Sequence, residues 1–334
     1  MDIIPKHDQW NADVKFPREE RMSFSSRMAV AVGVIGPFVG LLAAVALLWG
    51  RGIGWIDLWL LVGMYSLTVV GVTVGFHRLF THKSFETHPW VRALLAIFGS
   101  MSIQGPVIKW CAIHRRHHQE SDNEGDPHSP HLHGDGFVAM LKGMWHAHVA
   151  WIFEPDPENI QRSVKDLVAD PILMWVNNWF ALWVALGMII PAACGFALTH
   201  SWYGALTGLL WGGLVRAFLM HHVTWSINSV CHVWGTRPFD SQDHSRNNFP
   251  IAIISFGEGW HNNHHAFPTS ARHGLKWWQI DISYLFIRSM QLIGLAWNVR
   301  VPTPKAQQSK VRHQRKPITS PSAHPIPHGA SEPA

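Results

Sequence analysis

The sequence predicts an all-α integral membrane protein in which four transmembrane helices form two hairpins and carry a helical, histidine-rich cap. Three observations lead to this prediction. Four segments are apolar over enough residues to cross a bilayer. Two links of only a few residues join these segments in pairs. The chain of 334 residues also holds 24 histidines, an unusually large number, and the closely spaced ones fall outside both links.

The first hairpin is predicted from residues 28–49 and 55–76. The first segment is uncharged over about 22 residues, which at about 1.5 Å per residue spans a hydrocarbon core of about 30 Å. The second is interrupted only by Asp57, and the short sequence Arg-Gly-Ile-Gly joins the two. Residues 1–26 are polar and lack the apolar run of a signal peptide, so we expect an N-terminal segment on the cap side of the membrane.

The second hairpin is predicted from residues 172–198 and 202–223, which a link too short for any other arrangement connects. Residues 77–171 and 224–300 would then form the cap. Residues 27–300 together would make up one membrane domain. Residues 89–108 of the cap are only moderately apolar, and there we expect a helix that lies on or dips into the membrane interface and does not span it.

The parts of the chain outside the spans are predicted to lie on one side of the membrane. Residues 301–334 are rich in Pro, Ser, Lys and His, which predicts a disordered basic tail. With four spans, both termini and both cap segments face the same compartment. They hold nearly all the Lys and Arg, whereas the links hold only Arg51, so the positive-inside rule predicts the cytoplasm, with the spans in a bacterial inner membrane. The net charge of +5 therefore favours an anionic lipid surface, and no nucleic-acid partner is expected.

Two histidine clusters have the spacing i, i+3, i+4, which places three imidazoles on one helical face about 5–6 Å apart at Cβ. They are His114, His117 and His118 in the first cluster, and His261, His264 and His265 in the second. Charged imidazoles this close would repel, and with little acid around to neutralise them we expect neutral rings. Neutral imidazoles suit iron, zinc, copper or nickel, so both clusters are predicted metal ligands on the same side of the membrane.

A third pair, His77 and His82, lies at the end of the second span. Five residues correspond to about 140° on an ideal α-helix, so a straight helix would not direct both rings to one metal. Taken alone, the pair could be interfacial histidines at a helix end. Together with the two clusters on the same side, we interpret both residues as ligands.

The fourth span contributes a polar stripe made of His221, Trp225, Asn228 and His232, spaced four, three and four residues apart. Near the membrane an asparagine is costly unless it binds something. We therefore expect His232 to be a further ligand and Asn228 to hold a metal-bound water. The alternative is that these are ordinary polar residues of helix packing, the role we expect for His221.

Nine candidate histidines are too many for one zinc ion with four ligands and suit two metal ions. Soluble di-iron bundles use Glu and Glu-x-x-His, so this would be an all-nitrogen variant. Neutral ligands leave the charge of the metal ions uncompensated, which favours oxygen activation over hydrolysis.

These motifs resemble those of the membrane fatty-acid desaturases, specifically the acyl-CoA (stearoyl-type) Δ9 family. The matching segments are residues 75–82 (GFHRLFTH), 110–118 (WCAIHRRHH), 126–130 (DPHSP) and 257–268 (GEGWHNNHHAFP). Residues 224–232 (TWSINSVCH) are similar to the family's fourth-span segment. The resemblance covers about residues 30–300 and implies four spans with a cytosolic catalytic cap and two iron ions.

Carried over position by position, the resemblance implies a ligand set and a substrate tunnel. The ligands would be His77, His82, His114, His117, His118, His232, His261, His264 and His265, with Asn228 acting through water. The acyl tunnel would be lined by Gln104, Trp110, Thr224 and Trp225. The family removes two hydrogens from an unactivated methylene pair to give a cis double bond and reduces the co-substrate O2 to water, with no catalytic residues beyond the metal ligands. Electrons would come from cytochrome b5, ferredoxin or rubredoxin with its reductase.

The acyl substrate is less well specified than the metal site. Tyr65 lies about 18 Å before His77 along the second span, and we expect it to close the tunnel and limit chain length. Four cationic residues could meet the phosphates of a long-chain acyl-CoA, or equally be surface charges facing anionic lipid. They are Lys109, Arg115, Arg116 and Lys142. An acyl-lipid substrate is the alternative to acyl-CoA.

Two other functions use the same histidine pattern. A hydroxylase acting on fatty acid, sterol or carotenoid would share the scaffold, although the context of the last cluster and the Asn228 and His232 pair favour desaturation. A metal transporter would place its polar ligands in mid-membrane, whereas these histidines lie at span ends and outside the membrane.

Overall fold

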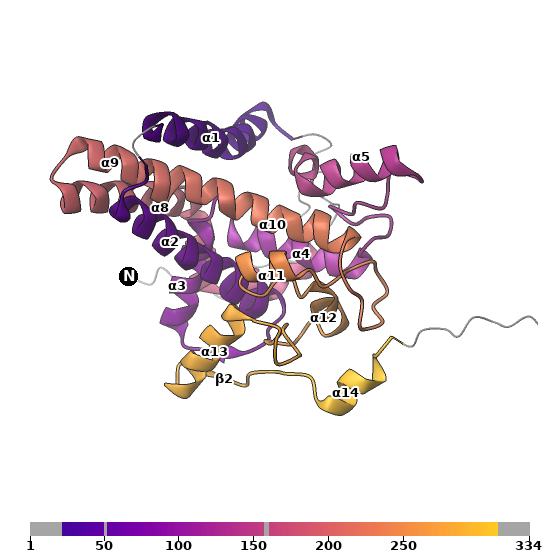
Figure 1. The fold of residues 1–334 in the computed structure, drawn as a ribbon. Helices are drawn as coiled ribbons and strands as arrows, with labels where there is room; N and C mark the ends of the chain where they lie inside the picture. Colours follow the sequence, from indigo (N-terminus) through magenta and orange to yellow (C-terminus); the bar gives the residue numbers. More distant parts are fainter. Residues whose placement is uncertain (1–21, 50–51, 157–159, 313–334) are drawn as a thin grey trace, which may run out of the picture.

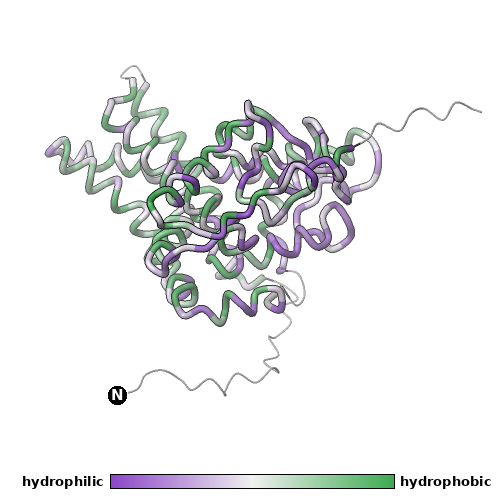
Figure 2. The backbone as a smooth tube through the Cα atoms, turned by 90° about the horizontal axis from the view of Figure 1, so that it is seen from below, coloured by the Kyte–Doolittle hydropathy of each residue, from purple (hydrophilic) through white to green (hydrophobic). Residues whose placement is uncertain are grey.

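The computed structural model describes residues 22–49, 52–156 and 160–312 (Figure 1). Within these residues, four helices are long and apolar enough to cross a membrane. They are Phe24–Leu48, Trp55–Thr81, Phe180–Thr199 and Trp202–Val233. The end of the first span and the start of the second lie at the same end of the molecule as the link between the third and fourth spans. This end is mostly hydrophobic in Figure 2, and the opposite end is mostly hydrophilic. The prediction of a four-span, all-α membrane fold is confirmed.

The first and third spans begin at other residues than predicted. Helix α1 (Phe24–Leu48) starts four residues earlier than expected, because the Ser23 side chain accepts a hydrogen bond from the Ser26 amide and caps it. The third predicted span is two helices, α7 (Pro171–Asn178) and α8 (Phe180–Thr199). Asp170 caps α7, which buries Leu173 and Val176 in the cap instead of extending the span.

The fourth span continues ten residues beyond its predicted end. It consists of α9 (Trp202–Gly208), the π-helical segment η4 (Leu209–Val215) and α10 (Arg216–Val233). No glycine or proline interrupts α10. The residues 224–233 that were assigned to the cap are therefore the last turns of this span.

A π-helical segment explains how His77 and His82 point the same way. The second span is α2 (Trp55–Val70) followed by η1 (Gly71–Thr81), and the His82 amide bonds the His77 carbonyl, five residues back, at 3.1 Å. This wider winding brings residues five apart to nearly the same side, which an α-helix would not. Gly71 allows close packing here, because a Cβ atom would lie 2.1 Å from the Gly99 nitrogen of the next helix.

The cap surrounds the end of the second and fourth spans with short elements. Between the hairpins these are α3 (Pro89–Ser100), α4 (Val107–Glu120), α5 (Phe137–His148), η2 (Ala150–Phe153), η3 (Ile160–Val164) and α6 (Lys165–Val168). After the fourth span they are α11 (Phe249–Ile254), α12 (His261–Ala266), α13 (Ile282–Leu292) and α14 (Pro304–Ser309). Strands β1 (Glu86–Thr87) and β2 (Ala296–Trp297) pair antiparallel and tie the two parts together.

The expected surface helix is shorter than predicted and packed on the protein. It ends at Ser100, and α4 begins separately at Val107. The prediction of disorder from residue 301 is also wrong for residues 301–312. Thr303 caps α14, and the Lys310 ammonium donates to the Ala266 carbonyl at 2.6 Å, so this segment is fastened to α12. Residues 313–334, like most of the predicted N-terminal segment, lie outside the described residues.

Candidate metal centre

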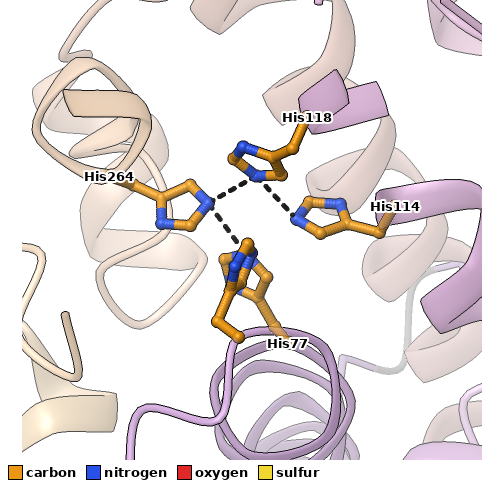
Figure 3. Close-up of side chains that lie close together, drawn as sticks. His77, His114, His118 and His264 are labelled. Carbon is orange, nitrogen blue, oxygen red and sulfur yellow. Dashed lines mark hydrogen bonds between the residues drawn. The ribbon is translucent and has the colours of Figure 1, made fainter. Parts of the chain in front are cut away.

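Five of the predicted histidines meet where the second span, α4 and α12 converge, and Figure 3 labels four of them. The members of this first histidine group are His77, His82, His114, His118 and His264, whose ring nitrogens lie within 4.8 Å of one another. The Nε2 atom of His264 lies 3.1 Å from that of His77 and 2.8 Å from that of His118. The Nε2 atom of His118 in turn lies 3.1 Å from that of His114. The nitrogens therefore point at a common centre.

The other four predicted histidines form a second group beside the first. Its members are His117, His232, His261 and His265, again with ring nitrogens within 4.8 Å. The two groups share α4 and α12, because His117 is the neighbour of His118 and His265 the neighbour of His264. The three histidines of each i, i+3, i+4 cluster are thus shared between the two groups and do not all point to one centre.

The hydrogen-bonding pattern of the second group fits a bound metal ion. A neutral imidazole carries one N–H and one lone pair. Because Nδ1 of His232 and of His265 donates to a carboxylate, each ring in its neutral form presents a lone pair on Nε2. Both Nε2 atoms lie about 3 Å from Nε2 of His261, at 3.1 and 3.0 Å, and its single N–H could satisfy only one of them. A metal ion among these nitrogens would satisfy all three.

The first group fits a metal ion for similar reasons. His82 is buried, and its Nε2 atom has no hydrogen-bond partner among the described residues. Burial first, and then the neighbouring imidazoles, lower the pKa of His82, His114, His118 and His264 well below its ordinary value. The rings are therefore neutral at pH 7, the form that binds metal.

Four carboxylates orient the histidines from behind, which the sequence analysis missed. Each accepts a hydrogen bond from an Nδ1 atom, and the pairs are His77 with Glu258 (2.6 Å), His117 with Asp126 (2.9 Å), His232 with Asp122 (2.8 Å) and His265 with Asp243 (2.6 Å). Such contacts fix the tautomer and leave Nε2 to the metal. The expectation of little acid around the clusters is wrong.

The pKa values of these carboxyl groups agree with their role as acceptors. Burial acts to raise the pKa of Asp126 and Asp243, but the charges of the histidines and the hydrogen bonds together outweigh it and lower both values. Asp122 and Asp126 follow the first histidine cluster closely in the chain, and Glu258 precedes the second, so spacing could have suggested them. Nothing in the sequence marks Asp243.

Glu258 also belongs to a buried charge network. Arg78, whose side chain is fully buried, pairs with Glu258 and with Asp281, the latter at 3.1 Å. The Arg78 guanidinium further donates to Nδ1 of His273 at 3.0 Å. The ligand His77 is thus connected through Glu258 to an arginine next to it in the chain.

A mostly apolar cavity borders both histidine groups. Its lining residues are Val69, Val72, Thr73, His77, Trp110, His114, Met220, Val223, Thr224, Ile227, Asn228, Ser255, Glu258 and His261. Of the predicted tunnel residues, Trp110 and Thr224 line it. Gln104 lies behind them, donating to Thr224 Oγ1 at 2.8 Å and accepting from Trp110 Nε1 at 3.3 Å. Asn228 is in the wall with ligands of both groups, as its expected role through water would require.

Two predicted substrate residues lie outside the lining of this cavity. Trp225 is buried with its ring stacked on His221 at 5.0 Å, so it packs within the helix bundle. Tyr65 lies one helical turn before Val69, and its hydroxyl donates to the Ile254 carbonyl at 2.6 Å. Tyr65 therefore stands behind the cavity wall, between the second span and the end of the cap helix α11.

The cations predicted to meet CoA phosphates are mostly engaged within the protein. All five N–H donors of Arg115 are used, by Asp166 and three backbone carbonyls. Lys109 pairs with Asp156 at 2.8 Å, and Arg116 with Glu120 at 3.4 Å. Lys142 is exposed on α5 and does not line the cavity. The geometry gives no support to phosphate binding by Arg115.

Comparison with known proteins identifies the family to which this chain belongs. The model of the fatty acid desaturase family matches residues 53–284, which include both histidine groups and the last three of the four spans. The chain belongs to the fatty acid desaturase family. The predicted family and enzyme class are confirmed, and the family model does not distinguish acyl-CoA from other acyl carriers.

Three named proteins are similar to this chain over most of their length. A hex-5-enoyl-(acyl-carrier protein) acetylenase of Moorena producens (strain JHB) is 46% identical over 276 residues, 82% of this chain and 86% of that protein. Delta-9 acyl-lipid desaturase 2 of Arabidopsis thaliana is 40% identical over 257 residues, 77% of this chain and 78% of that protein. An sn-1 stearoyl-lipid 9-desaturase of Anabaena variabilis is 37% identical over 239 residues, 71% of this chain and 80% of that protein.

Proposed function

We propose that this desaturase uses two iron ions, O2 and externally supplied electrons to insert a cis double bond, at Δ9, into a saturated acyl chain. The observation that carries the proposal is the apolar cavity whose wall holds ligands of both histidine groups. The first group, with His82 and His264, would hold one iron. The second group, with His232 and a water on Asn228, would hold the other. When bound, the iron ions supply the oxygen activation that removes hydrogen from an unactivated methylene.

The cavity residues hold the acyl chain in position and exclude water from the site of the reaction. Val69, Val72 and Met220 form a narrow apolar wall that excludes water and holds one part of an acyl chain against the histidine groups. The hydrogen bonds of Gln104 fix Thr224 and Trp110, so the polar part of the wall keeps its shape. The carboxylates at Nδ1 hold the ligand rings in place.

For the acyl carrier, we infer a membrane lipid. Two of the named relatives act on acyl lipids, and the donors of Arg115 are all engaged, which weakens the case for a CoA phosphate site. Long-chain acyl-CoA remains the second candidate, and the name of the acetylenase adds an acyl carrier protein as a third. The excess of Lys and Arg outside the span links supports a cytoplasmic location for the cap and for both ends of the chain.

Expression in a host without its own desaturase tests this proposal. We expect membrane lipids to gain a cis double bond at a fixed distance from the carboxyl end, mapped by mass spectrometry of the fatty acids. Purified protein given acyl-lipid or acyl-CoA with reductant would identify the carrier. An alcohol in place of the double bond, or unchanged fatty acids despite good expression, would contradict the proposal.

A substitution at Tyr65 should change the chain length of the product. Replacing Tyr65 with Ala removes the ring behind Val69, so the cavity can extend past Val69. Because one methylene in an apolar pocket changes selectivity by about tenfold or more, we expect a shift of about tenfold in the ratio of longer to shorter products. The control Tyr65→Phe loses only the hydrogen bond to Ile254 and should keep the wild-type profile. Identical product profiles for Tyr65→Ala and wild type would remove Tyr65 from this role.

A further inference from the structure

Three arginines gather on the cap beside the second histidine group. Arg237 and Arg246 belong to the loop that follows α10, and Arg312 follows α14. The terminal segment pairs with this loop, because the Arg312 amide donates to the Pro238 carbonyl at 2.9 Å and the Asp240 amide to the Lys310 carbonyl at 2.8 Å. We call Arg237, Arg246 and Arg312 the basic patch.

The basic patch forms no ion pair within the described residues. Arg78, Arg92 and Arg115 each form an ion pair with a carboxylate, whereas no described carboxylate lies within 4 Å of the patch guanidiniums. The Nε atoms of Arg237 and Arg246 are buried and have no hydrogen-bond partner among the described residues. Burial first, and then the positive charges of Arg312 and Arg246, lower the pKa of Arg237 and outweigh the opposing effect of Asp243 and Asp240. Such a surface attracts a negatively charged partner.

One carboxylate separates the basic patch from a metal ligand. Arg237 donates a hydrogen bond to the backbone carbonyl of Asp243, and the Asp243 carboxylate accepts from Nδ1 of His265 at 2.6 Å. The same loop makes a second connection, since the His244 amide and Nδ1 of His232 both bond Asp122 at 2.8 Å. The loop is therefore a thin layer of protein between the surface and the second histidine group.

The position of the basic patch favours a soluble partner over the bilayer. In Figure 1, α14 and α12 lie at the end of the molecule opposite the α8–α9 link, and this end is the hydrophilic one in Figure 2. A membrane that contains the four spans would lie around the other end. Lipid head groups are thus less suited to the patch than an acidic protein in the surrounding water.

We propose that the basic patch is the docking site of a small, acidic one-electron carrier protein, which it holds beside the second histidine group. This inference rests on the proposed function, which requires such a partner. Each turnover removes two hydrogens from the acyl chain and combines O2 with two electrons and two protons from outside to give two waters. The carrier protein must therefore supply one electron twice for each double bond that is formed.

Binding of a plant-type ferredoxin, an acidic 2Fe–2S protein, to the purified full-length chain tests the docking site. At about 20 mM salt we expect the exposed Arg312→Glu to weaken binding about threefold, and Arg237→Glu with Arg246→Glu and Arg312→Glu to weaken it at least about tenfold. The matched control Lys142→Glu reverses an exposed charge on α5 and should leave ferredoxin binding unchanged. Raising the salt to about 300 mM should weaken wild-type binding strongly and that of the triple variant little.

Three results would overturn the docking site. The first is wild-type ferredoxin affinity in the triple variant when its metal content and thermal stability are normal. The second is an equal loss in Lys142→Glu and Arg312→Glu. The third is a triple variant that loses affinity for phosphatidylglycerol vesicles but not for ferredoxin. Binding is measured without turnover, so a protein that binds ferredoxin through the basic patch but forms no double bond would contradict the proposed function alone.

Discussion

Replacing His264 with Ala is expected to abolish double-bond formation and to remove iron from the first histidine group. His264 is central to this group, because its Nε2 atom lies within 3.1 Å of those of His77 and His118. Loss of a residue that only orients a ligand typically reduces metal affinity or activity by about 10–100-fold, so loss of the ligand should reduce product by at least about 100-fold. Iron content of the purified protein and fatty-acid analysis of the expressing cells measure the two effects.

The matched control for this prediction is His133→Ala. His133 is an exposed histidine of the cap and belongs to neither group, so iron content and product should remain at the wild-type level. Should His264→Ala retain wild-type iron and activity, the first histidine group would not be the metal centre. Equal losses in both variants would show that the cap does not tolerate loss of any histidine.

The histidine groups illustrate what the sequence alone can predict. Spans, spacing and the side of the membrane identified the nine histidines that the fold gathers, because helical periodicity and bilayer thickness are local properties of the chain. Local spacing did not reveal that each i, i+3, i+4 cluster is shared between two centres. That division depends on how α4 and α12 face each other, which is a tertiary property.

The carboxylates and the π-helical segment mark the limit of such reasoning. Asp243 reaches His265 from 22 residues away, with no periodic pattern to link them. With an α-helical period, the side chains of His77 and His82 would point to different sides of the helix. The segment is a π-helix, and π-helices are so rare that no sequence rule predicts them. The Asp243 contact and the π-helical segment both depend on how distant segments of the chain come together at the metal centre, which local sequence patterns do not record.

Arg78 shows how strongly the metal centre depends on a charge far from solvent. Its side chain is fully buried between Glu258 and Asp281, and it also donates to the Ala271 carbonyl at 3.0 Å and to the Thr73 carbonyl at 3.2 Å. Removing the cation would leave two buried carboxylates without their counter-charge. Glu258 is in addition the acceptor for His77, so stability and ligand orientation depend on the same arginine.

Arg78→Met is therefore expected to lower the free energy of unfolding by about 3–5 kcal/mol, as is usual when one partner of a buried ion pair is removed. Thermal unfolding in detergent measures this loss. The matched control Arg92→Met breaks a partly exposed pair with Asp170 and should lower it by about 1 kcal/mol or less. Arg78→Lys keeps the charge without the planar fork, so we expect folded protein with less iron bound at His77. Equal stability of Arg78→Met and Arg92→Met would contradict the role of this network.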